Sequence, residues 1–154
     1  MKVQAVNKKL FKDNLEILLE QENTALISIL NSGRDRLTPD TQRVITLWFD
    51  DIHPTTTMTL GSCEEYNAMN VVDALNLIEF VLALPTNINR IIVHCSAGMC
   101  RSGAVADFLR VVFAVDNLWF VQNNPQIIPN EWVRVLLWMT WKMKHSEDRK
   151  QINI

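Results

Sequence analysis

Residues 93–104, VHCSAGMCRSGA, bring together the side chains of this chain that are best suited to chemistry. Two of the three cysteines and two of the four glycines lie here, beside a His, an Arg and a Ser. An apolar strand is expected to end in this stretch and a helix to begin. Because amide groups and the helix dipole attract anions at such a helix start, the sequence predicts an anion-binding loop that contains a nucleophile.

The backbone of this loop is the first part of the predicted site. We expect Gly98 to allow the tight or left-handed turn that aims successive N–H groups inward, and Gly103 to let the first helical turn approach closely. The alternative is that both glycines serve an ordinary turn. Arg101 adds a planar guanidinium that can bind two oxygens of a tetrahedral oxyanion. The expected phosphate-binding residues are Ser96, Ala97, Gly98, Met99, Cys100 and Arg101.

Cys95 is the candidate nucleophile. Amides, helix dipole and Arg101 are expected to stabilise its thiolate and to bring its pKa into the range of about 3.5–7.5 known for such cysteines. Ser102 can donate its hydroxyl to the sulfur and ease the departure of sulfur from phosphorus. A lone Cys at a strand end is otherwise a small buried hydrophobe. The joint occurrence of His, Cys, Gly, Arg and Ser favours the nucleophile.

A proton donor for the leaving group is expected outside the loop. Departure of an alkoxide or phenoxide from phosphorus needs a proton that a carboxylic acid can supply. Asp50 and Asp51 follow an earlier predicted strand, in WFDDIHP, and so are expected at the same edge of the sheet. The alternative is that the two acids only terminate that strand.

The pattern of His-Cys, five further residues and Arg-Ser resembles the signature of the cysteine-dependent protein tyrosine phosphatase superfamily. WFDDIHP resembles the acid-bearing loop of its compact branch, which includes dual-specificity and lipid phosphatases. NNPQIIPNEWVRVLL also looks like the tail of compact bacterial and phage members. The resemblance extends over roughly residues 25 to 140. It implies a dual-specificity phosphatase-like α/β fold with a central, mostly parallel sheet flanked by helices.

The resemblance also implies a role for each matched residue. Cys95 would form a phosphocysteine intermediate, Arg101 would hold the phosphoryl oxygens, and Ser102 would be the family's hydroxyl residue. His94 would organise the loop from behind, together with Gly103. Asp51 would be the general acid and Asp50 its neighbour. The interval between Asp51 and Cys95 departs from the pattern, because it is longer than in many compact members, with TTTMTLGS as the apparent insertion.

Cys100 precedes Arg101, an arrangement that is locally similar to that in low-molecular-weight tyrosine phosphatases. Because the loop curls around its ligand, the sulfurs of Cys95 and Cys100 could come within disulfide reach and form a reversible resting state. In the other interpretation Cys100 packs beneath the loop as a buried thiol. Both interpretations stay open.

The elements that must position these residues alternate between short strands and helices. Strands are expected over Lys2 to Val6, Ala25 to Leu30, Arg43 to Phe49 and Arg90 to Val93. We expect a helix that is capped by Asn7 and carries Phe11, Leu15 and Leu18. A second helix is expected to begin at the capping box Ser62-Cys63-Glu64-Glu65 and to end at Pro85. Its apolar face would consist of Val71, Leu75, Ile78 and Leu82. Gly103 to Val115 is apolar nearly all round, as in a buried central helix. Such alternation predicts βα units around a mostly parallel sheet.

A last helix is expected from Pro129-Asn130 onward. Its apolar stripe comprises Trp132, Leu136, Met139 and Met143, with Trp138 and Trp141 beside it. Core packing is the favoured interpretation of this stripe. An exposed remnant could instead serve an oligomer contact.

Composition indicates the number of domains, the general charge and the compartment of the protein. The 154 residues, 48% hydrophobic and 21% charged, fit one catalytic domain over 1–154. A formal charge of −2 gives no general attraction to nucleic acid or anionic lipid. Three cysteines without a disulfide spacing and a start without a signal-peptide core indicate the cytoplasm, and no apolar run approaches the roughly 20 residues of a membrane span.

These observations favour a metal-independent phosphomonoesterase of the tyrosine or dual-specificity class, without cofactor, that acts on a phosphorylated protein. The loop has no Lys, which disfavours inositol lipids, while RNA 5′-phosphates remain open. An oxyanion (arsenate) reductase would need a third shuttle cysteine, and Cys63 is expected at a helix start. Arg34 and Arg36 could steer a phosphopeptide, although a solvated loop is the simpler interpretation. The oligomeric state is left open.

Overall fold

In the computed structural model of the chain, residues 1–52 and 67–152 are described, with the side chains of 147–152 left aside. The described strands form one sheet in the order β1-β4-β2-β3, and every neighbouring pair is parallel. The strands are β1 (Lys2–Asn7), β2 (Thr24–Leu30), β3 (Val44–Trp48) and β4 (Arg90–Cys95). The expected α/β fold with a central parallel sheet is confirmed.

The sheet forms because its inner strands are apolar on both faces. All seven residues of β2 are buried, and five of the six in β4 are buried. Continuous apolar runs of this kind are typical of parallel strands covered on both sides. Since parallel strands all end at one edge, the loops after β2, β3 and β4 meet there.

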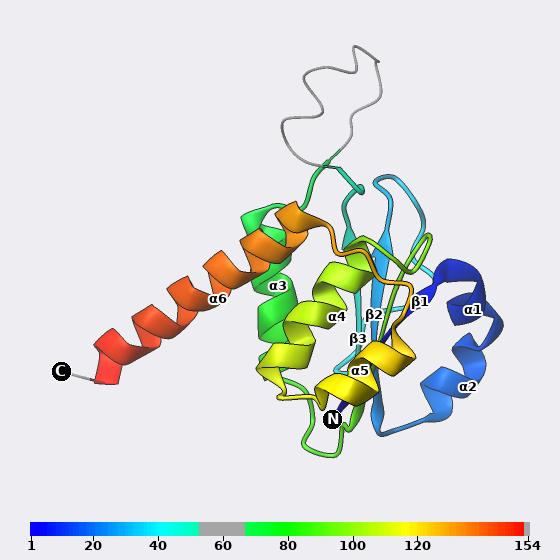
Figure 1. The fold of residues 1–154 in the computed structure, drawn as a ribbon, viewed down its shortest axis with the longest axis horizontal. Helices are drawn as coiled ribbons and strands as arrows, with labels where there is room; N and C mark the ends of the chain where they lie inside the picture. The colour runs from blue at the N-terminus through cyan, green and yellow to red at the C-terminus, as the bar shows by residue number, and fades with distance from the viewer. Residues whose placement is uncertain (53–66, 153–154) are drawn as a thin grey trace, which may run out of the picture.

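Helices cover both faces of the sheet (Figure 1). On one face lie α1 (Lys8–Asp13) and α2 (Leu15–Glu20), whose Phe11 and Leu18 pack on apolar side chains of the strands. On the other face lie α3 (Val71–Leu82), α4 (Arg101–Val112), α5 (Asn117–Asn123) and α6 (Glu131–Ile152). The larger core cluster lies on this second face.

The predicted helix after Asn7 is two short helices. Asn7 caps α1 as expected, because its Oδ1 accepts a hydrogen bond from the Leu10 N–H at 2.8 Å. The break occurs at Asn14, whose side-chain amide donates to the Leu10 carbonyl at 2.9 Å. An Asn side chain that competes for backbone groups in this way disfavours a continuous helix.

The start and the buried face of α3 differ from the prediction. The helix begins at Val71, and a capping box formed by Asn70 and Asp73 stabilises its first turn. The predicted box over Ser62 to Glu65 lies outside the described residues. Val71 and Leu82 are exposed. The buried face is instead formed by Ala74, Leu77, Ile78 and Val81.

The central helix is as deeply buried as expected but ends earlier. α4 stops at Val112 instead of Val115, because Ala114 adopts a left-handed conformation with φ of 47°. The Val115 N–H then bonds back to the Arg110 carbonyl at 2.9 Å. Such closure around a left-handed residue is a common helix C-terminus.

The stripe predicted for the last helix is wrong in its second half. Leu136 is buried, but Met139 is 57% exposed and Met143 is 58% exposed. The buried face of α6 consists of Val133, Leu136, Leu137 and Thr140, and the C-terminal half of this helix runs out beyond the sheet (Figure 1). In the described part of the chain, no helix combines the length and apolarity that crossing a membrane requires.

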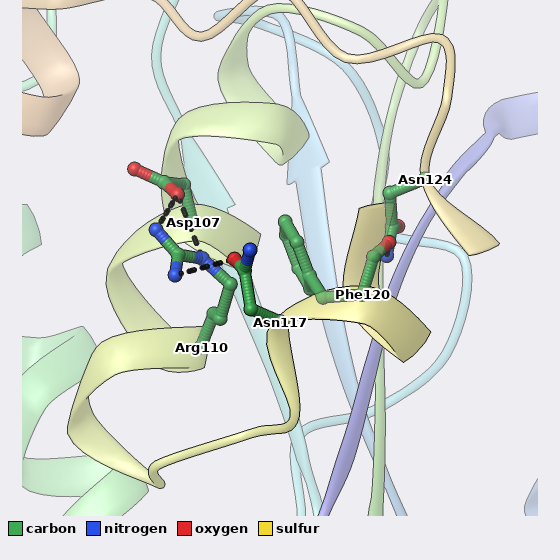
Figure 2. A network of polar contacts seen from close by, with 5 residues as sticks. All are labelled: Asp107, Arg110, Asn117, Phe120 and Asn124. Carbon is green, nitrogen blue, oxygen red and sulfur yellow. Dashed lines mark hydrogen bonds and ion pairs between the residues drawn. The ribbon is translucent and has the colours of Figure 1, made fainter. Parts of the chain in front are cut away.

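One helix, α5, was not predicted, and the residue that follows it binds the edge strand β1. Arg110 of α4 bonds to Asp107 at 2.8 Å and to Asn117 of α5 at 3.1 Å, and its guanidinium lies over Phe120 (Figure 2). After α5, the buried Asn124 side chain accepts from the Ala5 N–H at 2.7 Å and donates to the Val3 carbonyl at 3.1 Å. Asn124 thus provides hydrogen-bond partners for backbone groups of β1, as a neighbouring strand would.

Candidate active site

The predicted loop, residues 96–100, joins the end of β4 to the start of α4. It lies at the edge of the sheet where the other strands also end. The Ser96 hydroxyl contacts Asn31, which follows β2, and the Arg101 guanidinium donates to the carbonyl of Phe49, which follows β3, at 2.7 Å. Tertiary folding therefore brings the segments that follow β2 and β3 to this loop.

The carbonyl groups of the loop are bound from outside. Lys8 N donates to the Ser96 carbonyl (3.3 Å), and Gln126 Nε2 donates to the Gly98 carbonyl (3.3 Å). Ile128 N donates to the Met99 carbonyl (3.2 Å), and Asn130 N donates to the Cys100 carbonyl (3.1 Å). In a trans peptide the C=O and the following N–H point in opposite directions. Holding the carbonyls outward therefore turns the N–H groups toward the inside of the loop.

Gly98 is required by this geometry. Its φ is +73°, and a Cβ at this position would lie 2.5 Å from the backbone of Val6 and of Asn7 at the end of β1. A side chain would therefore be both strained and in steric conflict. At Gly103 a Cβ would lie 3.0 Å from the Ile127 side chain, in keeping with the close approach expected there.

Cys95 is 2% exposed at the base of the loop. Burial raises the pKa of its thiol, but hydrogen bonds to the sulfur outweigh burial and lower the pKa below its ordinary value. The donors are the Ser102 hydroxyl, whose oxygen is 3.1 Å from the sulfur, and the backbone N–H groups of Ser102, Met99 and Gly98. This loop therefore favours a thiolate, as is typical of reactive cysteines.

Arg101 is 3% exposed and is held rigidly beside the loop. One terminal nitrogen donates to the Phe49 carbonyl, and the other donates to the Ser96 hydroxyl at 3.1 Å. Its Nε is buried and has no hydrogen-bond partner among the described residues. A buried donor of this kind can bind an anion oxygen at little cost in reorganisation.

His94 lies behind the loop and is fully buried. Its Nε2 is 2.7 Å from the Ser28 hydroxyl, and its ring stacks on Phe11 with centroids 4.1 Å apart. Burial lowers its pKa to about 4. His94 is thus a neutral hydrogen-bonded residue at pH 7.

The two candidate acids occupy different environments. Asp50 is 7% exposed, and its carboxylate accepts from the Ser32 hydroxyl at 3.0 Å and from the Asn67 N–H at 2.9 Å. Asp51 is exposed and lies beside Cys100, and its Oδ1 accepts from the Asn130 side-chain amide at 2.8 Å. Asp50 therefore holds the loop after β3, and of the two candidate acids Asp51 is the exposed one.

Cys100 occupies the junction between the loop and α4. Burial first, and then the charge and hydrogen bond of Asp51, raise the pKa of its thiol. Cys95 and Cys100 are both free thiols. Cys63, the third cysteine of the reductase alternative, lies outside the described residues.

The two arginines near the rim differ in their contacts. Arg36 pairs with Asp40 at 3.3 Å, and its guanidinium lies 5.0 Å from the ring centroid of Trp48. The Trp48 indole N–H donates to the Arg34 carbonyl at 2.8 Å, so this loop is tied to β3. The Arg34 side chain is exposed.

Sequence reasoning missed the residues that bind the loop from outside. Lys8, Gln126 and Asn130 are polar residues without a motif of their own, and their partners lie far away in the sequence. The segment NNPQIIPNEWVRVLL carried a resemblance but no assigned role. Its PQIIPN portion proves to run along the back of the loop.

Comparison with known proteins supports the fold. No protein-family model matches the sequence, and a search of curated proteins found no match. Among solved structures, the chain is similar to "Crystal Structure of PTPMT1 in complex with PI(5)P", with a TM-score of 0.52 and 16% sequence identity, covering 95% of this chain and 94% of that one. PTPMT1 is a dual-specificity-like member of the protein tyrosine phosphatases. The similarity confirms the expected phosphatase-type fold.

Proposed function

We propose that this protein is a metal-independent phosphomonoesterase of the tyrosine or dual-specificity class. The observation that carries this proposal is the buried Cys95 sulfur, which hydrogen bonds hold toward the thiolate form within a ring of N–H groups. Beside it, Arg101 offers a buried Nε–H without a protein acceptor among the described residues. A thiolate, inward-facing amides and a guanidinium together suit a tetrahedral phosphoryl dianion.

In the first step, the Cys95 thiolate attacks phosphorus. The S–P bond forms while the bond from phosphorus to the leaving oxygen breaks, and Asp51 gives its proton to that oxygen. The loop amides and Arg101 stabilise the charge on the three remaining phosphoryl oxygens. The products are a free alcohol or phenol and a phosphocysteine.

In the second step, water hydrolyses the phosphocysteine. The new P–O bond forms while the S–P bond breaks, and the Asp51 carboxylate accepts a proton from the attacking water. The Ser102 hydroxyl, 3.1 Å from the sulfur, stabilises the departing thiolate. Inorganic phosphate leaves, and both Cys95 and Asp51 return to their starting states.

The favoured substrate is a phosphorylated protein, because the loop side chains themselves carry no cation besides Arg101. A phosphoinositide is the second candidate, since the matched structure contains PI(5)P. Lys8 adds a cation from outside the loop: its N–H binds the Ser96 carbonyl, and its charge helps to lower the pKa of His94. Phosphotyrosine and phosphoserine peptides, phosphoinositides and RNA 5′-phosphates assayed side by side distinguish these substrates and the RNA phosphatase alternative.

Hydrolysis of an aryl phosphate in the presence of a chelator tests the proposed chemistry. Wild type is expected to turn over without added metal, and Cys95→Ser is expected to lose at least about a thousandfold in kcat, because the nucleophile is gone. Rapid denaturation during turnover followed by peptide mass mapping is expected to find phosphate on Cys95. Turnover that survives in Cys95→Ser, or that requires added metal, would overturn the proposal. Thiol-dependent arsenate reduction in place of hydrolysis would support the reductase alternative.

A further inference from the structure

We propose that Asn130 is a positioning residue that holds the Asp51 carboxyl group in register with the phosphate-binding loop. This inference rests on the proposed function, in which Asp51 is the general acid. Asn130 lies just before α6, far in the sequence from both Asp51 and the loop. It nevertheless contacts both of them directly.

Four hydrogen bonds fix Asn130. Its side-chain amide donates to Asp51 Oδ1 at 2.8 Å, and its backbone N–H donates to the Cys100 carbonyl at 3.1 Å. Its side-chain oxygen accepts from the Val133 N–H at 3.1 Å, and its carbonyl accepts from the Arg134 N–H at 3.1 Å. The residue is thus anchored on the first turn of α6, and its side-chain amide extends from there to bind Asp51.

The amide is a suitable partner for a carboxyl group that must deliver a proton. An Asn NH₂ can only donate, so the Asp51 oxygen that it binds must act as the acceptor. In the protonated acid this favours the proton on Oδ2, the oxygen that Asn130 does not bind. The neutral amide adds no formal charge beside the acid.

The same residue sets the distance between acid and nucleophile. Cys100 belongs to the loop that surrounds the Cys95 sulfur, and its carbonyl is held by the Asn130 backbone. Asp51 is exposed, and its carboxyl group lies beside the Cys100 thiol. The contact with Asn130 therefore links the acid to the loop, and a misplaced acid is costly in rate.

Asn130→Ser is the decisive variant. Serine is as good a helix cap as asparagine and keeps the backbone N–H, but its short side chain does not reach Asp51. With phenyl phosphate, whose leaving group needs the acid, kcat is expected to fall on the order of tenfold. With p-nitrophenyl phosphate, whose leaving group needs the acid less, kcat is expected to change less than about twofold. Inhibition by orthovanadate is expected to be unchanged.

A double-mutant cycle separates positioning from a structural role. In the Asp51→Asn background, Asn130→Ser is expected to cause no further loss with phenyl phosphate, because its effect passes through Asp51. Asn70→Ser makes the same exchange at the cap of α3, which the proposed chemistry does not use, and is expected to match wild type with both substrates.

Other results would overturn either the role of Asn130 or the assignment of Asp51 as the acid. An unchanged kcat for phenyl phosphate in Asn130→Ser, or an equal loss in the Asp51→Asn background, would overturn the role of Asn130. A weaker orthovanadate inhibition would show that Asn130 supports only the loop. If Asp51→Asn itself retains full turnover of phenyl phosphate, the assignment of the acid fails as well. The phosphatase proposal depends separately on Cys95→Ser.

Discussion

At the scale of single residues, the neighbouring Cys95 and His94 are both buried, but their surroundings favour a charged thiol and a neutral imidazole. Burial opposes the charged form of both the Cys95 thiol and the His94 imidazole. Cys95 receives N–H and O–H donors that favour its thiolate, so its pKa falls despite burial. His94 is hydrogen-bonded to the Ser28 hydroxyl, and its pKa falls to about 4. An anionic sulfur is the state that a nucleophile needs, and the neutral His94 ring packs on Phe11 and bonds to Ser28.

The lowered pKa of His94 predicts a loss of stability in acid. The unfolded chain binds a proton on His94 near the ordinary value of about 6.5, whereas the folded chain binds it only near 4. Acid therefore favours the unfolded state, and the free energy of unfolding is expected to fall by a few kcal/mol between roughly pH 6.5 and 4. Denaturant unfolding across this range measures the effect.

The control is His94→Asn, which keeps a polar side chain but cannot titrate. Its free energy of unfolding is expected to be lower than that of wild type at pH 7 and to depend less on pH between 6.5 and 4. Identical pH dependence in the two proteins would mean that His94 is not the group that titrates.

At the scale of elements, the loop over residues 96–100 is shaped by its neighbours as much as by its own sequence. The turn from β1 to α1 binds the Ser96 carbonyl, and residues 126–130 bind the next carbonyls along the loop. Gly98 lies where these two supports meet, in contact with the end of β1. The loop can thus keep its amides inward before any ligand arrives, which is the preorganisation that electrostatic catalysis requires.

Gly98→Ala and Gly33→Ala form a matched pair that tests this support. Both glycines have nearly the same positive φ, but a Cβ at Gly33 meets no atom within 4 Å, whereas a Cβ at Gly98 lies 2.5 Å from the backbone of β1. Gly33→Ala is expected to cost only the conformational strain of about 1–2 kcal/mol. Gly98→Ala is expected to cost more and to weaken orthovanadate inhibition at least about tenfold.

Denaturant unfolding and inhibition measured on both variants decide the matter. Equal losses of stability in the two variants, with inhibition unchanged, would contradict the claim that β1 shapes the loop.

The elements also show what the sequence could and could not predict. The strands and the loop were predicted because continuous apolar runs and a dense local motif are visible without tertiary information. The helix that the sequence did not predict, α5, has seven residues, too few for a reliable periodicity. The left-handed Ala114 that separates it from α4 leaves no sequence signal. The buried face of α6 was misassigned because apolar residues surround this helix, and only packing selects Val133 and Leu137 over Met139 and Met143.

For the site, the sequence predicted the residues within the motif and missed those that contact it from afar. Cys95, Arg101 and Ser102 lie within one short stretch, so their proximity was foreseeable. Gln126 and Asn130 reach the loop only because the chain passes along the edge of β1 and then turns into α6. The different environments of Asp50 and Asp51 likewise depend on tertiary contacts.

At the scale of the whole molecule, the parallel sheet explains how these distant segments form one site. Every strand ends at the same edge, so the residues after β2, β3 and β4 surround a single point (Figure 1). The similarity to PTPMT1 extends over nearly all of both chains at 16% identity. The architecture that gathers these segments can thus persist while most side chains differ.

The pH dependence of Cys95 alkylation by iodoacetamide, followed by peptide mass mapping, tests the central claim most directly. Our account predicts that Cys95 reacts with a midpoint below the ordinary thiol value of about 8.5, that inorganic phosphate protects it, and that Ser102→Ala moves the midpoint upward. A midpoint at or above the ordinary value, without protection by phosphate, would contradict the account.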